Sequence, residues 1–131
     1  MPNICIIGLG NPGIKYNGTR HNVGKDWVKS IATDHNLSLK SHKKIESTVA
    51  SSTDDKILWV YPDQYVNESG RSIKKIIKTN NFNLEQIIVI HDDLDLPTGS
   101  LKLKIGGGHG GHNGLRSIIS NSGKSFIRLR E

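Results

Sequence analysis

The sequence has little of several features that would place it in a specialised class. It contains one cysteine, Cys5, so no disulfide can form within the chain, which fits a reducing compartment. No segment approaches the ~20 consecutive apolar residues that a membrane-spanning helix needs. The first residues, Met1 to Asn3, lack the basic and apolar regions of a secretory signal. We therefore expect a cytoplasmic protein that does not contact a membrane.

Repeats, low-complexity tracts and flexible linkers are also missing. Only seven residues are aromatic and 34% are hydrophobic, yet isoleucine, leucine and valine gather in short runs, which argues against disorder. A chain of 131 residues can bury one core and little more. The sequence therefore predicts a single domain over residues 1–131.

Acidic residues are scarce outside the middle of the chain. Residues 1–44 hold seven basic and two acidic side chains, and residues 102–131 hold six and one. Residues 45–101 hold five basic and nine acidic side chains, and the whole chain carries +6. Two basic ends favour a polyanionic partner, with nucleic acid the first candidate, although a solvated basic surface gives the same composition.

Strand-like and helix-like patterns alternate along the chain. Their order predicts an α/β domain in which helices flank a mixed, twisted sheet. Short β-branched runs and alternating residues predict the strands, and apolar residues at helical spacing predict the helices. The predicted strands are 4–7, 46–51, 56–61, 86–90, 101–105 and 126–130; the predicted helices are 22–35, 69–78 and 112–120.

Three of these predictions concern how particular segments lie in the fold. Residues 46–51 and 56–61 should form a hairpin, and residues 36–44 should be a polar loop. Along 22–35 the apolar stripe should consist of Val23, Trp27, Val28 and Ile31. Alternation of Leu and Lys in 101–105 predicts a strand with one wet face.

A glycine-rich turn follows the first predicted strand. Residues 8–13, Gly-Leu-Gly-Asn-Pro-Gly, match the dinucleotide-binding pattern. That pattern requires a helix to begin at once, whereas the residues after Pro12 are rich in turn formers. The two other interpretations are a tight turn, or a turn that presents Asn11 to a site.

Polar side chains gather where predicted strands end. Asn11, Asp92 and His112 each follow a strand, and His21 and Asn67 lie at or just before a helix start. Ligands of open α/β sheets bind beyond the carboxyl ends of the strands, so these five residues are candidates for one cleft.

His21 is the best candidate general base, because imidazole titrates near neutral pH. A carboxylate such as Asp92 would fix its tautomer, and Asn11, Asn67 and Asn113 would donate hydrogen bonds to a developing oxyanion. The structural alternatives are a helix-capping or surface histidine at position 21 and turn-capping aspartates after the strand.

Two rival chemistries are weaker. A nucleophilic enzyme is disfavoured, because the chain lacks a G-x-S-x-G elbow and Cys5 lies in an apolar strand. Histidines and aspartates of a metal site would lie on loops without a rigid spacing, so we expect neither a metal nor a cofactor. That set comprises His91, Asp92, Asp93, Asp95, His109 and His112.

Basic residues recur at alternate positions near the end of the chain. Lys102 and Lys104 should share one face of their strand, as should Arg128 and Arg130. Such spaced pairs suit contacts with a phosphate backbone, and a solvated sheet face explains them equally well.

Three motifs together resemble bacterial peptidyl-tRNA hydrolase. They are the glycine turn with Tyr16 and Thr19 to Gly24, the segment His91 to Pro97, and the segment Gly106 to Leu115. Asn67 to Gly70 is similar to the family's asparagine motif. The resemblance runs from the first predicted strand to residue 131.

The resemblance implies cleavage of the ester between a peptide and the terminal ribose of tRNA, without metal. His21 would activate the water and Asp92 would orient His21. Asn11, Asn67 and Asn113 would bind the peptide or the carbonyl under attack, with His112 and Tyr16 lining the cleft. Lys102, Lys104 and Arg130 would grip tRNA phosphates. Peptidyl-tRNA is the expected partner, with no obligate protein partner and a monomeric state.

The chain departs from the family's pattern in two ways. Val66 and Glu68 flank Asn67 where the family usually has Met and Leu. The family's chain also continues about one third further, into C-terminal helices, so we expect a short or C-terminally truncated member. The alternatives are an RNA-binding module that has lost turnover and, third, a metal-dependent phosphodiesterase.

Overall fold

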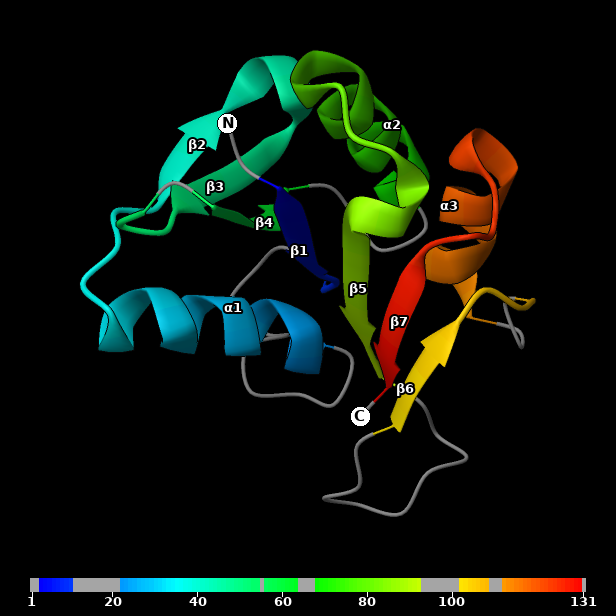
Figure 1. The fold of residues 1–131 in the computed structure, drawn as a ribbon, viewed down its shortest axis with the longest axis horizontal. Helices are drawn as coiled ribbons and strands as arrows, with labels where there is room; N and C mark the ends of the chain where they lie inside the picture. Colours follow the sequence, from blue (N-terminus) through cyan, green and yellow to red (C-terminus); the bar gives the residue numbers. More distant parts are fainter. Residues whose placement is uncertain are drawn as a thin grey trace.

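A computed structural model describes residues 3–10, 22–54, 56–63, 68–92, 102–108 and 112–130. Within these ranges, seven strands form one mixed sheet with three α-helices against it (Figure 1). The predicted α/β class with a helix-flanked mixed sheet is confirmed.

The elements are numbered as in Figure 1. The strands are β1 (Ile4–Gly8), β2 (Lys40–His42), β3 (Ser47–Ser51), β4 (Ile57–Pro62), β5 (Ile87–His91), β6 (Lys102–Ile105) and β7 (Ile127–Arg130). The α-helices are α1 (Val23–Asp34), α2 (Ser69–Asn80) and α3 (Asn113–Ser122), and two short 3₁₀ turns are η3 (Lys43–Ile45) and η5 (Leu84–Gln86).

The sheet order is β2-β3-β4-β1-β5-β7-β6. The neighbours β4, β1, β5 and β7 run parallel, while β2–β3, β3–β4 and β6–β7 are antiparallel. The chain adds β4 on one side of β1 and then crosses to β5 on the other side. In parallel sheets, the carboxyl ends of strands at such a reversal are the usual ligand site.

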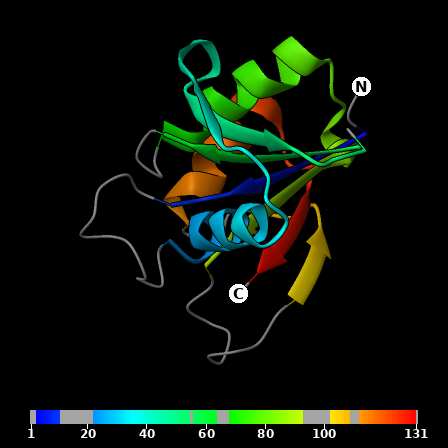
Figure 2. The ribbon, with the colours of Figure 1, turned by 90° about the vertical axis from the view of Figure 1, so that its left-hand side faces the viewer.

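Helices cover both faces of the sheet. Figures 1 and 2 show α1 on one side and α2 and α3 together on the other. The main core lies under α2 and α3, where large apolar side chains are fully buried, each contributing about 1.5–3 kcal/mol. It includes Cys5, Ile7, Val60, Ile73, Ile76, Ile87, Val89, Leu115, Ile118 and Phe126.

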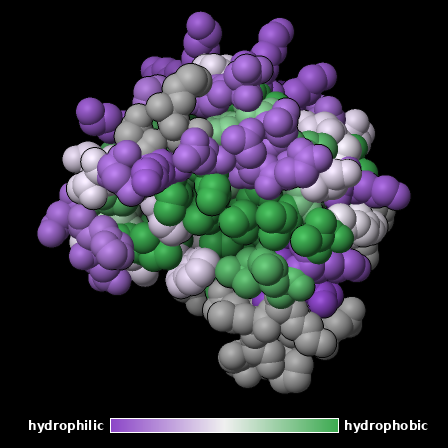
Figure 3. Space-filling model, viewed as in Figure 1, coloured by the Kyte–Doolittle hydropathy of each residue, from purple (hydrophilic) through white to green (hydrophobic). Residues whose placement is uncertain are grey.

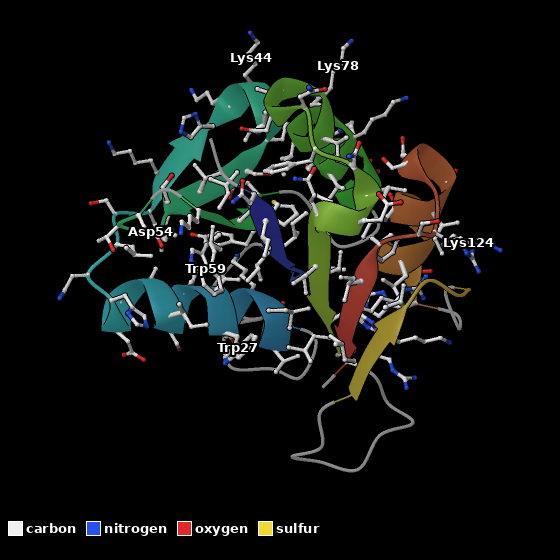
Figure 4. All side chains as sticks on the ribbon, viewed as in Figure 1. Trp27, Lys44, Asp54, Trp59, Lys78 and Lys124 are labelled. Carbon is white, nitrogen blue, oxygen red and sulfur yellow. The ribbon has the colours of Figure 1, made fainter. Side chains whose placement is uncertain are left out.

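The predicted stripe of α1 is only partly right. Val28 is buried, but Trp27 is 39% exposed, and the buried face runs through Gly24 and Ala32. A Cβ on Gly24 would lie 2.2 Å from the carbonyl oxygen of Ile90. The lack of a side chain at Gly24 therefore allows α1 to pack closely against β5. Figure 4 shows Trp59 of β4 between the sheet and α1.

The predicted polar loop over 36–44 is wrong, because it contains β2 and the start of η3. All three β2 residues are exposed, and the strand pairs with β3 through its backbone. An edge strand of this kind buries no alternating apolar face, so periodicity gave no signal for it.

The single wet face predicted for residues 101–105 is also wrong. Leu103 is 67% exposed and Ile105 is 76% exposed, and Lys104 on the opposite face is exposed too. β6 lies at the sheet edge, and α1 packs on β1, β4 and β5 rather than over it. Figure 3 shows the resulting hydrophobic area over β5, β7 and β6.

The other predicted elements are confirmed within one or two residues, including the β3–β4 hairpin and helices α2 and α3. Among the described residues, no helix is both long enough and apolar enough to cross a membrane.

Candidate active site

Two strand ends and the start of α1 meet at one point of the sheet. The backbone N–H of Leu9, just after β1, donates to the carbonyl of Ile90 in β5 at 3.0 Å. The Lys25 N–H in turn donates to the Leu9 carbonyl at 3.1 Å. Leu9 therefore lies beside the end of β5. Asp92, which follows β5, is 8% exposed.

Asp92 is hydrogen-bonded to His112. The His112 Nε2 lies 2.8 Å from Asp92 Oδ1, and both side chains are largely buried. His112 is also the N-cap of α3, where its Nδ1 accepts a hydrogen bond from the Leu115 N–H at 3.2 Å. Because Nδ1 accepts, Nε2 carries the proton and donates to Asp92. Both ring nitrogens of His112 therefore form hydrogen bonds within the protein.

His91 is a third buried member of this cluster. Its Nδ1 donates to the Asp92 carbonyl at 2.8 Å, and its ring meets that of His112 edge-on at 5.0 Å between centroids. Burial lowers the pKa of His91 to about 4, so the ring is neutral near pH 7. The sequence predicts His91 as a candidate metal ligand and as the first residue of a family motif, and it gives no signal of this structural role.

A row of basic residues crosses the sheet beside the cluster. In register, Arg130 of β7 lies opposite His91 on one side and position 102 of β6 on the other. Lys104 lies opposite Arg128. Lys104 is exposed and its ammonium lies next to Gly107, where a Cβ would be only 2.9 Å from Nζ. The side chain of Lys102 lies outside the described part of the chain.

Arg128 does not belong with the exposed cations. It is 2% exposed, and its guanidinium donates to the carbonyls of Gly107 and Gly108. The interpretation of Arg128 and Arg130 as an equivalent pair on a solvated or phosphate-binding face is therefore wrong for Arg128, because a buried side chain cannot reach a phosphate.

Four predicted site residues, Asn11, Tyr16, His21 and Asn67, lie outside the described residues. Asn113 is described, exposed, and adjacent to His112. It lies at one end of a shallow groove of about 380 Å³ on α3, whose lining is Asn113, Arg116, Ser117, Ser120 and Asn121. The structure thus brings Asp92 and His112 into contact, and Asn113 follows His112 as the first residue of α3.

Glu68, one of the two departures in the asparagine motif, is the N-cap residue of α2. Its carboxylate lies 3.6 Å from the Arg71 guanidinium in an exposed ion pair. An exposed pair of this kind contributes little to stability. The Glu68 carboxylate points toward Arg71 of the same helix.

The described residues hold no group of three or more His, Cys, Asp or Glu side chains arranged to bind a metal ion. Of the predicted rival set, Asp93, Asp95 and His109 lie outside these residues. The described members form hydrogen bonds with one another instead.

The fold and the site define an α/β protein with a buried carboxylate–imidazole pair at the carboxyl ends of its central parallel strands. Comparison with known proteins narrows this class. The family described as Peptidyl-tRNA hydrolase matches residues 5–131. The chain belongs to the peptidyl-tRNA hydrolase family, and is therefore a member of a family of enzymes.

Individual relatives support this membership. The chain is 46% identical over 129 residues to peptidyl-tRNA hydrolase of Rickettsia bellii, covering 97% of this chain and 70% of the relative. It is 48% identical over 125 residues to that of Aliarcobacter butzleri, covering 95% and 67%. A crystal structure of the Acinetobacter baumannii enzyme superposes with a TM-score of 0.92 at 41% identity, covering 99% and 68%. The resemblance predicted from the motifs is confirmed.

Proposed function

We propose that this chain hydrolyses the ester bond between a peptide and the terminal ribose of tRNA, with a histidine-activated water and no metal. The observation that carries the proposal is the buried Asp92–His112 pair, held 2.8 Å apart at the carboxyl end of β5. It stands where an α/β sheet places its ligand, in a chain of the peptidyl-tRNA hydrolase family.

His21 is the general base of this proposal. Its imidazole takes a proton from water, and the water oxygen bonds to the ester carbonyl carbon. The bond from that carbon to the ribose oxygen then breaks, and His21 returns the proton to the ribose. His112 is unsuited to this role, because its two nitrogens are committed to Leu115 and Asp92.

Asp92 orients the base. A buried carboxylate beside an imidazole fixes its tautomer and stabilises the imidazolium that forms during proton transfer. Asn11, Asn67 and Asn113 bind the peptide or the carbonyl under attack, and Tyr16 and His112 line the cleft. Lys102, Lys104 and Arg130 bind tRNA phosphates.

One assay tests the activity. The chain is incubated with an N-blocked aminoacyl-tRNA, with and without a chelator, and free tRNA and blocked amino acid are measured. Release that survives the chelator supports the proposal. Binding without release would indicate an RNA-binding module, and chelator-sensitive cleavage of phosphate esters would indicate a metal-dependent phosphodiesterase.

Two variants test the roles. His21→Ala should lower turnover by about 10²–10⁴-fold while tRNA binding stays nearly intact, because general-base catalysis contributes that much. Asp92→Asn should cost less, because it removes an orienting charge and keeps the shape. A larger loss for Asp92→Asn than for His21→Ala would reverse the two roles.

A further inference from the structure

Arg128 is a buried cation in the middle of a strand. Its side chain is 2% exposed, and its guanidinium carbon lies 4.8 Å from the centre of the Phe126 ring. Burial, with a smaller contribution from Arg130, lowers its pKa. Burying a charge is costly unless hydrogen bonds compensate for the lost water. The partners of this guanidinium therefore indicate what it does.

Those partners are two consecutive carbonyl groups of Gly106 to Gly108, which follow β6 and are called the glycine segment below. Nη1 donates to Gly108 and Nη2 donates to Gly107. The backbone turns there, with φ of 69° at Gly106 and 101° at Gly107, a region that glycine adopts without strain. Two parallel N–H groups of a planar guanidinium suit two adjacent acceptors, which a lysine ammonium cannot match.

Hydrogen bonds hold the described residues on both sides of positions 109–111. Arg128 of β7 holds Gly107 and Gly108 at the end of β6. At the other end, His112 is bonded to Asp92 and caps α3. Only three residues, 109–111, separate Gly108 from His112. Because three residues span only a short distance, the position of Gly108 limits where His112 and Asn113 can lie.

We propose that Arg128 is a positioning residue for this site: its guanidinium anchors the glycine segment and thereby sets the positions of His112 and Asn113. The inference rests on the proposed function for its effect on turnover. It assigns Arg128 a role different from that of Arg130 and Lys104, although all three occupy the same side of neighbouring strands.

The competing role is a phosphate contact. A residue that neutralises a phosphate contributes to the salt dependence of tRNA binding. Arg128 is almost completely buried and both of its terminal nitrogens bind carbonyls, so it should make no such contribution. Turnover and salt dependence therefore separate the two roles.

The test compares Arg128→Lys with a matched control, Arg71→Lys. Arg71 is a half-exposed arginine on α2, bonded to Glu46 and distant in sequence from the glycine segment. For each folded protein we would measure kcat, KM and the salt dependence of tRNA binding. Amide hydrogen exchange over residues 106–112 reports the anchoring directly.

Arg128→Lys should lower kcat by about 10–100-fold, the effect expected when reacting groups shift by about 1 Å. KM and the salt slope should stay nearly unchanged, and amides of residues 106–112 should exchange faster. Arg71→Lys should match the wild type. A wild-type kcat in folded Arg128→Lys, or a flattened salt slope, would overturn the proposal.

A second variant keeps Arg128 and lengthens the connection. One extra glycine inserted after Gly108 should lower kcat to a similar extent without changing the melting temperature, because it uncouples the anchored carbonyls from His112. Wild-type kcat in this insertion variant would overturn the proposal even if Arg128→Lys failed to fold. Absence of hydrolysis in the wild type would reject the proposed function alone, since amide exchange still reports the anchoring.

Discussion

His112 makes two hydrogen bonds, one at each nitrogen of its ring. Its Nδ1 caps α3 and its Nε2 binds the Asp92 carboxylate, so one ring joins a helix end to a strand end. His91 contacts both residues, through its hydrogen bond to the Asp92 carbonyl and its edge contact with the His112 ring. Each contact has a separate, measurable consequence.

The two contacts of His112 can be separated by substitution. His112→Ala removes the cap and should destabilise the protein by about 1 kcal/mol, whereas His112→Asn keeps a good capping residue and should retain most of that stability. Both variants lose the 2.8 Å bond to Asp92, so both should lose turnover. Denaturant unfolding and the aminoacyl-tRNA assay measure the two effects. Equal stability of the two variants would mean that the cap contributes nothing.

Buried His91 should make stability fall in mild acid. Its pKa in the folded chain is about 4, below the ordinary value of 6.5, so the unfolded chain binds the extra proton first. The stabilisation is complete above pH 6.5 and is lost as the pH falls toward 4, by at most about 3 kcal/mol. The titratable and charged groups facing the ring are His112, Asp92 and Arg128.

The matched variant for this effect is His91→Asn, whose amide can still donate to the Asp92 carbonyl. Its free energy of unfolding should depend less steeply on pH between 6.5 and 4 than that of the wild type. Urea unfolding at several pH values provides the measurement. Identical slopes would assign the acid sensitivity to other groups.

At the scale of elements, glycine contacts decide how closely helices approach their neighbours. Gly24 brings the first turn of α1 against the end of β5, next to Asp92. On the other face, a Cβ on Gly70 of α2 would lie 2.0 Å from the Ser117 carbonyl of α3, and the Gly70 N–H donates to Ser117 Oγ at 2.9 Å. The positions of the helices around the site therefore depend on glycine, which has no side chain, at positions 24 and 70.

Gly24→Ala should destabilise the protein although alanine favours helices. The added Cβ would lie 2.2 Å from the Ile90 carbonyl oxygen, so α1 must shift, at a cost of about 1–3 kcal/mol. Ser30→Ala on the exposed side of the same helix is the control and should change stability by less than about 0.5 kcal/mol. Thermal and denaturant unfolding test both. Equal stability of the two variants would show that the contact relaxes freely.

At the scale of the whole molecule, the cations that we propose to bind tRNA phosphates lie together. Lys104 and Arg130 lie on strands beside the Asp92 cluster, while the more distant Lys44 and Lys78 project from the opposite end of the molecule (Figure 4). The hydrophobic area over β5, β7 and β6 occupies the other face of these strands. Affinity for phosphate should therefore come from one edge of the sheet.

If Lys102, Lys104 and Arg130 each neutralise a phosphate, log affinity for tRNA should fall with log salt at a slope of roughly −2. Lys104→Ala should flatten that slope by about 0.7 and weaken binding to all tRNAs alike. Lys78→Ala removes an equally exposed charge from α2 and should leave the slope unchanged. The affinity for tRNA, measured at several salt concentrations for the wild type and both variants, tests this prediction. An unchanged slope for Lys104→Ala would exclude β6 from the tRNA contact.

Much of this fold could be predicted from sequence because its elements carry strong local patterns. Runs such as Ile87 to Ile90 and the stripe of Ile73 and Ile76 specify a buried strand and a helix without reference to the rest of the chain. The motifs likewise identified the family, and the positions of Asp92 and His112 after predicted strands indicated that they lie close together. These features depend on residue types and spacing alone.

Tertiary structure decided the features that depend on neighbours distant in sequence. β2 exists because its backbone pairs with β3, and α1 buries Gly24 rather than Trp27 because β5 lies against it. Arg128 and Arg130 occupy alternate positions of one strand, so the sequence treats them alike. In the structure Arg128 is buried and bonded to the carbonyls of Gly107 and Gly108. Burial and hydrogen-bond partners are properties of the packed chain, so local patterns cannot separate a structural arginine from a binding one.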